Sequence, residues 1–260
     1  NDISDNELER SELKYRVDKA SSKDGHIIEL VAEKYRDKFT TDLKKIEYDY
    51  SCSLLSLPLA LSSQIGYEIP SLIPYLSPNQ NDIEKFSKIL GKKNKLRVGL
   101  VWSGENRPRH GLNYKNRSAS LKMFSKIIDV ENIDFVSLQL GNPQKELLQW
   151  DGKEIFDPMN DVSDMEDTAA LVFNLDLIIS VDTSIAHLAG ALGKPVWMIT
   201  RSDCCWRWLE NREDTPWYPT MKIFRSQPGS LRHAIDLVAI SLPDFVTTWQ
   251  QHSLLKGMSS

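Results

Sequence analysis

The stretch Asp176-Leu-Ile-Ile-Ser-Val-Asp-Thr-Ser-Ile-Ala-His-Leu-Ala-Gly-Ala-Leu-Gly-Lys-Pro-Val196 predicts a strand, a sharp turn, a helix and a second strand. Residues 177–181 are a mostly apolar, β-branched run, which is typical of a strand that is buried on both faces. Asp182 or Thr183 can cap the helix expected over 184–192. Gly193 suits the position just past the end of that helix, because glycine adopts positive φ without strain.

A helix that starts directly after a buried parallel strand has a chemical consequence. Its first backbone N–H groups have no partner within the helix, and the positive end of the helix dipole lies at the same place. The stretch around Asp182 therefore predicts an anion-binding site at the carboxyl end of a strand.

The composition sets bounds on the class of protein. The chain has 260 residues, of which 41% are hydrophobic and 26% charged, with a formal net charge of −4. This balance argues against a general nucleic-acid or membrane-surface binder, so any phosphate binding is expected to be local. The chain starts with Asn1 rather than Met, which is compatible with a piece of a longer protein.

The cysteines and the apolar runs indicate a cellular compartment. Cys52, Cys204 and Cys205 are an odd set without C-x-x-C spacing, which argues against a disulfide framework or a structural zinc site. No signal-peptide pattern opens the chain, and no apolar run reaches the roughly 18–20 residues of a membrane helix. The sequence thus predicts a cytoplasmic protein without a membrane span.

The chain changes character at the basic linker Lys92-Lys-Asn-Lys95, where we expect a domain boundary. After it, short apolar runs alternate with helical patterns, which predicts βαβ units, a parallel sheet and a doubly wound α/β domain. Such a sheet binds ligands at the carboxyl ends of its strands, near the point where the strand order reverses. The expected strands are 96–102, 133–138, 154–156, 177–181, 195–200 and 221–224, and the expected helices are 82–90, 120–128, 143–150, 165–175, 184–192 and 231–240.

The turn after residue 181 supplies the first candidate ligands. The Thr183 hydroxyl and the backbone N–H groups near Ser184 and Ile185 could hold a phosphate, which leaves Asp182 for hydroxyl groups. His187 lies one turn into the helix and could share that ligand. The alternative is plain helix capping with a structural histidine.

The loop after the first regular strand provides basic residues on the same expected edge. Ser103 and Gly104 begin it, and Arg117 ends it just before a helix, where a cation can reach phosphates. Arg107 and Arg109 stay undecided between function and a solvated basic loop. His110 is a candidate for acid–base or acceptor-side chemistry.

Two further segments permit two interpretations each. The segment 204–219 is dense in Trp and Tyr, which could stack on a base or sugar beside Arg207 or simply pack under a long connection. The acidic run 161–167 resembles a metal cluster, but Asp161 and Ser163 are better explained as caps of the next helix. We expect Cys204 and Cys205 to be buried or incidental.

Taken together, these motifs resemble the C-terminal glycosyltransferase-like domain of bacterial tetratricopeptide-repeat proteins. That domain is related to glycosyltransferase family 9, the heptosyltransferases, and more distantly to O-linked GlcNAc transferases. The resemblance lies in residues 54–61, 97–104, 116–118, 135–139, 167–171, 176–197, 206–209 and 214–219. It implies a GT-B architecture of Rossmann-like doubly wound parallel sheets, with a nucleotide-sugar donor bound by the second domain and normally no metal or other cofactor.

The resemblance also assigns roles and domains. It implies that Asp182, Thr183 and Ser184 contact the donor sugar and diphosphate, that His187 supports them, and that Arg117 lies near the diphosphate. Residues 1–95 would be an incomplete, α-rich or partly Rossmann-like acceptor-side region with a linker, 96–245 the nucleotide-sugar-binding domain and 246–260 a tail.

The function expected from these observations is a nucleotide-sugar-dependent glycosyltransferase, or its donor-binding part, which moves a hexosyl or heptosyl group to a glycan or protein hydroxyl. His110 and Arg117 are the candidate catalytic residues. Ser103, Gly104, Asp182, Thr183, Ser184, His187 and Arg207, together with Arg117, are the candidate donor-binding residues. Two alternatives remain open, a non-catalytic sugar-nucleotide-binding or interaction module and a GT-B-fold sugar-nucleotide epimerase.

Overall fold

The computed structural model describes residues 71–104 and 117–257, which lie in a unit that runs from Pro70 to Ser260. All six segments predicted as strands form strands of one sheet, in which every neighbouring pair is parallel. The strand order is β3-β2-β1-β4-β5-β6. The strands are β1 (Leu96–Val101), β2 (Ile133–Ser137), β3 (Ile155–Phe156), β4 (Leu177–Val181), β5 (Val196–Thr200) and β6 (Met221–Arg225).

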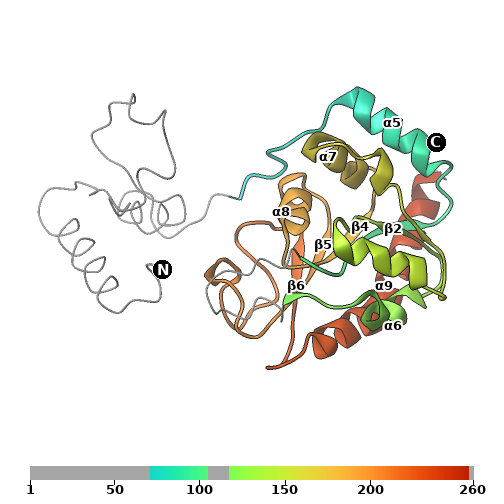
Figure 1. Ribbon diagram of the computed structural model, residues 1–260. Helices are drawn as coiled ribbons and strands as arrows, with labels where there is room; N and C mark the ends of the chain where they lie inside the picture. Colours follow the sequence, from blue (N-terminus) through green and yellow to red (C-terminus); the bar gives the residue numbers. More distant parts are fainter. Residues whose placement is uncertain (1–70, 105–116, 258–260) are drawn as a thin grey trace, which may run out of the picture. The chain divides into compact units, whose positions relative to one another are not determined.

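Helices cover both faces of this sheet, so the predicted doubly wound α/β fold is confirmed (Figure 1). The α-helices are α5 (Gln80–Leu90), α6 (Ser125–Ile128), α7 (Met165–Phe173), α8 (Ser184–Ala191) and α9 (Arg232–Gly257). The 3₁₀ helices are η5 (Leu121–Phe124), η6 (Asn142–Gln149), η7 (Met159–Asp161) and η8 (Trp206–Trp208).

Each strand divides its side chains between two hydrophobic cores, because successive residues point to opposite faces. In β4, Ile178 packs into the core formed with α5, α7 and α8. Leu177 and Ile179 pack into the other core, formed with η5, α6 and α9. All five β4 residues are buried, which explains why this strand is almost continuously apolar.

Three predicted helices differ from the structure. The helix expected over 120–128 is a 3₁₀ turn followed by one short α-helical segment, and the one expected over 143–150 is the 3₁₀ helix η6, in which no residue is buried. The closing helix does not end at Ile240 but continues to Gly257. Its apolar stripe extends further than expected, because Leu242 and Val246 are also buried against the sheet.

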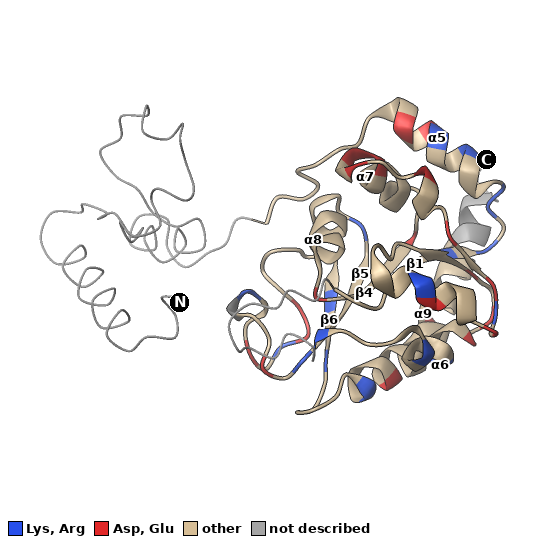
Figure 2. Ribbon diagram, viewed as in Figure 1, with Lys and Arg blue, Asp and Glu red and all other residues tan. Residues whose placement is uncertain are grey.

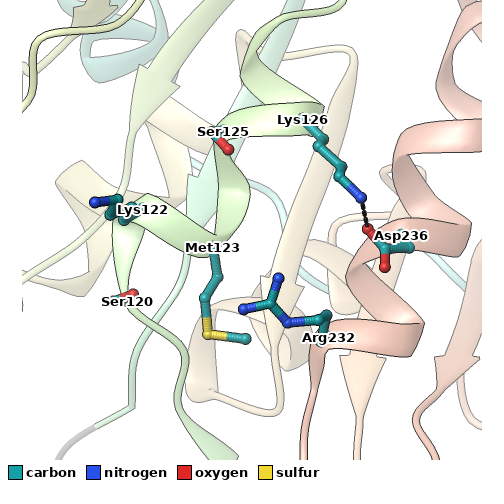
Figure 3. A pocket seen from close by; sticks show the side chains of 7 residues that line it. All are labelled: Ser120, Lys122, Met123, Ser125, Lys126, Arg232 and Asp236. Atoms are coloured by element: carbon teal, nitrogen blue, oxygen red, sulfur yellow. Dashed lines mark hydrogen bonds and ion pairs between the residues drawn. The ribbon is translucent and has the colours of Figure 1, made fainter.

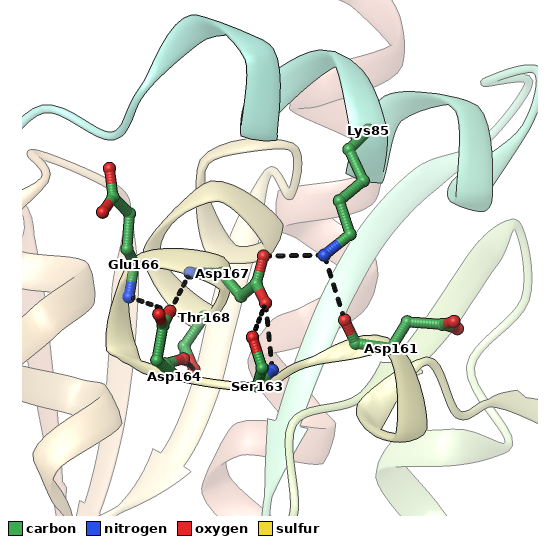
Figure 4. A network of polar contacts seen from close by, with 7 residues as sticks. All are labelled: Lys85, Asp161, Ser163, Asp164, Glu166, Asp167 and Thr168. Carbon is green, nitrogen blue, oxygen red and sulfur yellow. Dashed lines mark hydrogen bonds and ion pairs between the residues drawn. The ribbon is translucent and has the colours of Figure 1, made fainter.

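A polar network joins α5 to the start of α7 (Figure 4). The N-cap of α7 is Asp164, which accepts from the N–H groups of Glu166 and Asp167, so the prediction that Asp161 and Ser163 cap this helix was wrong. Ser163 instead donates to Asp167, and Lys85 on α5 pairs with the same carboxylate at 2.8 Å. The hydrogen bond from Lys85, with those from Ser163, lowers the pKa of Asp167 to about 2.

Candidate functional site

The candidate site lies where the strand order reverses, between β1 and β4. From β1 the chain moves outward to β2 and β3, whereas from β4 it moves to β5 and β6 on the other side. Val101 of β1 pairs with Ser180 of β4, so the two strands end side by side. The predicted residues Ser103 and Asp182 each follow two positions later and therefore leave the sheet at the same edge. This is the place where doubly wound sheets bind ligands.

The start of the β1 loop is fixed by Gln139, a residue that the sequence analysis did not select. Its Oε1 accepts from the backbone N–H groups of Trp102 and Ser103 at 3.1 and 2.9 Å. Its Nε2 donates to the carbonyls of Ser103 and Leu140, both at 3.0 Å. Because Gln139 is buried, this amide is a rigid internal bracket between the ends of β1 and β2.

Gly104 and Arg117 lie together at the two ends of that loop. The Gly104 N–H donates to the Ser118 hydroxyl at 3.1 Å. A Cβ atom added at Gly104 would lie 3.2 Å from Nε of Arg117, so the guanidinium packs directly over the glycine. The structure thus places Ser103, Gly104 and Arg117 next to one another at the two ends of the loop.

The turn from β4 into α8 has the predicted form but a different hydrogen-bond pattern. Thr183 occupies the N-cap position with an extended backbone, yet its side chain makes no capping bond. Its hydroxyl lies 2.9 Å from that of Ser180, which itself donates to the Val181 carbonyl at 2.7 Å. Since Ser180 has one proton, the Thr183 hydroxyl is the donor between them, and binding a ligand through that proton requires this bond to open.

The N-terminus of α8 contrasts with that of α7. Helix α7 has Glu166 and Asp167 in its first turn as well as an aspartate cap. Helix α8 has no acidic residue in its first turn and is drawn without charge in Figure 2. No negative charge within the first turn of α8 therefore neutralises the positive end of its dipole, and Ser184 at the start of the helix is exposed.

His187 faces an aromatic cluster. Its Nδ1 lies 3.0 Å from the Tyr218 hydroxyl, and its ring stacks on Trp208 with centroids 4.9 Å apart and an interplanar angle of 26°. Burial lowers the pKa of His187, and the positive charge of Arg207 lowers it further, whereas Asp182 opposes the shift. The imidazole is therefore neutral at neutral pH, and both Asp182 and Arg207 lie within electrostatic reach of it.

The aromatic loop between β5 and β6 packs inward. Trp208 is fully buried and Tyr218 almost so, which favours the packing interpretation for these two rings over an open stacking platform for a base. Both rings contact His187.

Two arginines tie the same loop to its cysteines. Arg207 donates to Cys205 Sγ and Arg225 donates to Cys204 Sγ, both at 2.7 Å. The thiols are half-buried hydrogen-bond acceptors, and both pack against the core formed with α5, α7 and α8.

The remaining predicted residues fall into two groups. His110, Arg107 and Arg109 lie outside the described residues, so their positions are not part of the site described above. In the described ranges 71–104 and 117–257, no group of three or more His, Cys, Asp or Glu could hold a metal ion, and the acidic run 161–167 caps and braces α7 instead.

A separate pocket of about 390 Å³ lies between η5–α6 and the start of α9 (Figure 3). It is lined by Ser120, Lys122, Met123, Ser125, Lys126, Arg232 and Asp236. Lys126 pairs with Asp236 at 2.7 Å across it. None of the predicted donor-binding residues is among this lining, so the pocket is distinct from the β1–β4 edge.

A family model matches part of the chain. Residues 163–200 match the model of Glycosyltransferase family 9 (heptosyltransferase). The matched segment contains α7, β4, the turn, α8 and β5, and therefore Asp182, Thr183, Ser184 and His187.

The individual relatives are distant. Protein FlbA of Caulobacter vibrioides is 27% identical over 201 residues, which cover 71% of this chain and 33% of FlbA. The ADP-heptose heptosyltransferase II of E. coli is 12% identical with a TM-score of 0.44, covering 68% of this chain and 57% of that one. The E. coli heptosyltransferase WaaC with ADP-2-deoxy-2-fluoro heptose is 15% identical with a TM-score of 0.38, covering 73% and 53%. The chain thus spans about a third of FlbA and little more than half of each heptosyltransferase.

None of the helices in the described part of the chain combines the length and the apolar character that crossing a membrane requires.

Proposed function

We propose that this chain is the donor-binding part of a nucleotide-sugar-dependent glycosyltransferase, which moves a hexosyl or heptosyl group to a glycan or protein hydroxyl. One observation carries the proposal: the segment that matches the glycosyltransferase family 9 model contains the β4–α8 turn, and this turn lies at the reversal point of the sheet. The matched segment includes Asp182, Thr183, Ser184 and His187, which lie in that turn and at the start of α8.

The donor diphosphate would bind between the two groups of residues at this edge. The N-terminus of α8 supplies backbone N–H groups at Ser184 and Ile185, and no acid in its own first turn competes with the ligand. Arg117, which packs over Gly104 at the end of the β1 loop, would supply a cation at this edge, with Ser103 nearby. Asp182 would accept from sugar or ribose hydroxyls, and Arg207 adds positive charge near His187.

The chemistry would be a displacement at the anomeric carbon. The bond from that carbon to the phosphate oxygen breaks, a bond to the acceptor oxygen forms, and the acceptor proton passes to a base, for which His110 is the candidate. Arg117 and the α8 dipole stabilise the negative charge that develops on the departing nucleoside diphosphate. Because these groups supply the positive charge, the reaction would need no metal ion or other cofactor.

The remaining assignments complete the proposal. The acceptor would bind partly through the part of the chain before the sheet, while the unit that runs from Pro70 to Ser260, which includes α5 and the whole of α9, would hold the donor. The reaction would take place in the cytoplasm, where nucleotide sugars are soluble substrates.

Calorimetric titration of the purified chain with ADP, UDP and GDP, and then with their sugar conjugates, tests the donor site. Arg117→Ala should weaken binding of both the diphosphate and the conjugate by about 10- to 100-fold, the range for a hydrogen bond to a charged group. Asp182→Ala should weaken binding of the sugar conjugate more than binding of the bare nucleoside diphosphate. Arg232→Ala is the matched control, because it removes an exposed arginine from the separate pocket. Binding that is absent, or unchanged in both site variants, would overturn the proposal.

Mass spectrometry of the reaction products separates the remaining alternatives. Release of nucleoside diphosphate together with a free or transferred sugar supports the transferase. Nucleotide binding without turnover favours a non-catalytic binding module. A donor that changes its sugar configuration, with no acceptor present, indicates an epimerase.

A further inference from the structure

The hydroxyl of Tyr218 lies between two partners. On one side, the Tyr75 hydroxyl donates to it at 3.5 Å, and on the other side it lies 3.0 Å from Nδ1 of His187. Both tyrosines are held against α8. The Tyr75 N–H donates to the Ala191 carbonyl at 3.0 Å, and the Tyr218 ring fills the space beside Gly190.

The position of one proton decides what His187 offers to a ligand. Burial raises the pKa of Tyr218, so this phenol keeps its proton. Burial lowers the pKa of His187, so the imidazole has one N–H and one bare nitrogen. Two arrangements are then possible: the phenol donates to Nδ1, or Nδ1–H donates to the phenol oxygen.

Chemistry and geometry favour the first arrangement. A phenol is a stronger acid than a neutral imidazole N–H, and an imidazole nitrogen is a stronger base than a phenol oxygen. The Tyr218 oxygen also already accepts the proton of Tyr75, so its own proton is directed to its remaining partner, Nδ1. The proton of the imidazole itself then lies on Nε2.

We propose that Tyr218 is a positioning residue, which donates to Nδ1 of His187 and thereby holds the imidazole in its Nε2–H form as a neutral hydrogen-bond donor. The stacked ring of Trp208 fixes the plane of the imidazole, so the Nε2–H bond points in one fixed direction. The group that would accept this hydrogen bond is an oxygen of the diphosphate or sugar of the bound nucleotide sugar, and this part of the inference rests on the proposed function. Asp182 and Arg207 are the charged groups that act on this ring.

The tautomer can be measured without any ligand. In the chain labelled with ¹⁵N-histidine, the two ring nitrogens of each of the five histidines give different shifts for N–H and bare nitrogen. His187→Asn identifies the His187 signals by their loss. We expect bare Nδ1 and protonated Nε2 in the wild-type chain. The opposite pattern, or an equal mixture, would overturn the proposal.

Tyr218→Phe then removes the hydroxyl but keeps the ring beside Gly190. We expect the Nε2–H preference to be lost and the affinity for the nucleotide sugar to fall about tenfold. The overall thermal unfolding of the protein should stay unchanged. Tyr75→Phe is the matched control, because Tyr218 keeps its own proton. It should leave the tautomer unchanged and the affinity within about twofold.

The outcomes separate this inference from the proposed function. If the wild-type chain binds no nucleotide, the proposed function fails, whereas the ligand-free tautomer measurement still decides the role of Tyr218. If nucleotide binds and Tyr218→Phe changes affinity without changing the tautomer, or the tautomer without affinity, Tyr218 is not the positioning residue of a ligand-binding histidine.

Discussion

The ring of Tyr218 occupies the space that a side chain at position 190 would need. A Cβ atom added to Gly190 would lie 2.5 Å from both Cγ and Cδ1 of that ring, far inside normal contact distance. Gly190 lies in the last turn of α8, inside the helix, where glycine is otherwise unfavourable. Its presence there is explained by the close approach of Tyr218, whose hydroxyl contacts His187 one turn earlier in the helix.

Gly190→Ala should therefore destabilise the protein although alanine is the better helix former. Overpacking of a buried site costs about 1–3 kcal/mol, whereas the gain in helix propensity is at most about 1 kcal/mol. We expect a net loss in the free energy of unfolding, measured by urea denaturation, and a weaker His187–Tyr218 contact.

A double-mutant cycle identifies the cause of this loss. When Tyr218 is first changed to Leu, a smaller and flexible side chain, Gly190→Ala should become neutral or stabilising. An equal loss in both backgrounds would show that the ring of Tyr218 is not what requires glycine.

The sequence predicts the parts of this fold that depend on local pattern. The β4–α8 stretch has a buried β-branched run and Gly193 with φ of 70°, and the structure confirms both. Of the two expected cap residues, Asp182 and Thr183, the second occupies the N-cap position, but without the expected side-chain hydrogen bond. The sequence does not predict contacts between side chains that the folded chain brings together from distant positions. Gln139 and Tyr218 were not selected for this reason, because their partners lie 36 and 31 residues away.

A weak signal for Gln139 does exist. It is a polar residue directly after an apolar strand, which in a parallel sheet places it at the carboxyl edge. For Thr183, the sequence predicts where the residue lies but not which group its hydroxyl contacts. Its position at the N-cap was predictable, but its hydrogen bond to Ser180 depends on how β4 ends.

Gln139→Ala should lower both stability and ligand affinity. The change leaves the N–H groups of Trp102 and Ser103 without their acceptor, and each buried, unpaired group costs about 1–3 kcal/mol. We expect a loss of about 2–4 kcal/mol in the free energy of unfolding, after allowing for water entry at Ser103. Gln149→Ala, at an exposed position, is the control and should change stability by less than about 0.5 kcal/mol. Equal effects of the two changes would contradict the role of Gln139 as a bracket.

The Lys85–Asp167 pair should make the protein sensitive to strong acid. The folded pKa of Asp167 is about 2, against an unfolded value of 3.8, so the unfolded state binds more protons between these values. The stabilisation is complete above pH 3.8 and is lost as pH falls towards 2. The shift corresponds to about 2 kcal/mol.

Asp167→Asn tests this window. The variant should be less stable than the wild-type chain at pH 6 by about 2 kcal/mol, and the difference should shrink as pH falls through 3.8. Asp134→Asn is the control, because Asp134 pairs with Lys95 at 3.4 Å and both side chains are substantially exposed. A constant difference between the Asp167→Asn variant and the wild-type chain at all pH values would show that the charge of Asp167 does not contribute.

His187 should add a second pH dependence, at a higher pH. Because burial holds its folded pKa below the ordinary value of 6.5, the unfolded state binds more protons between the two values. Stability should therefore fall as pH is lowered from about 7.5 through 6.5, with a slope of at most about 1.4 kcal/mol per pH unit from this group. His187→Asn removes that part of the slope in chemical denaturation series, whereas His233→Asn, at an exposed position on α9, should keep it. If the wild-type and His187→Asn chains show the same slope, the imidazole is not held neutral by its surroundings, and its role as a neutral hydrogen-bond donor is contradicted as well.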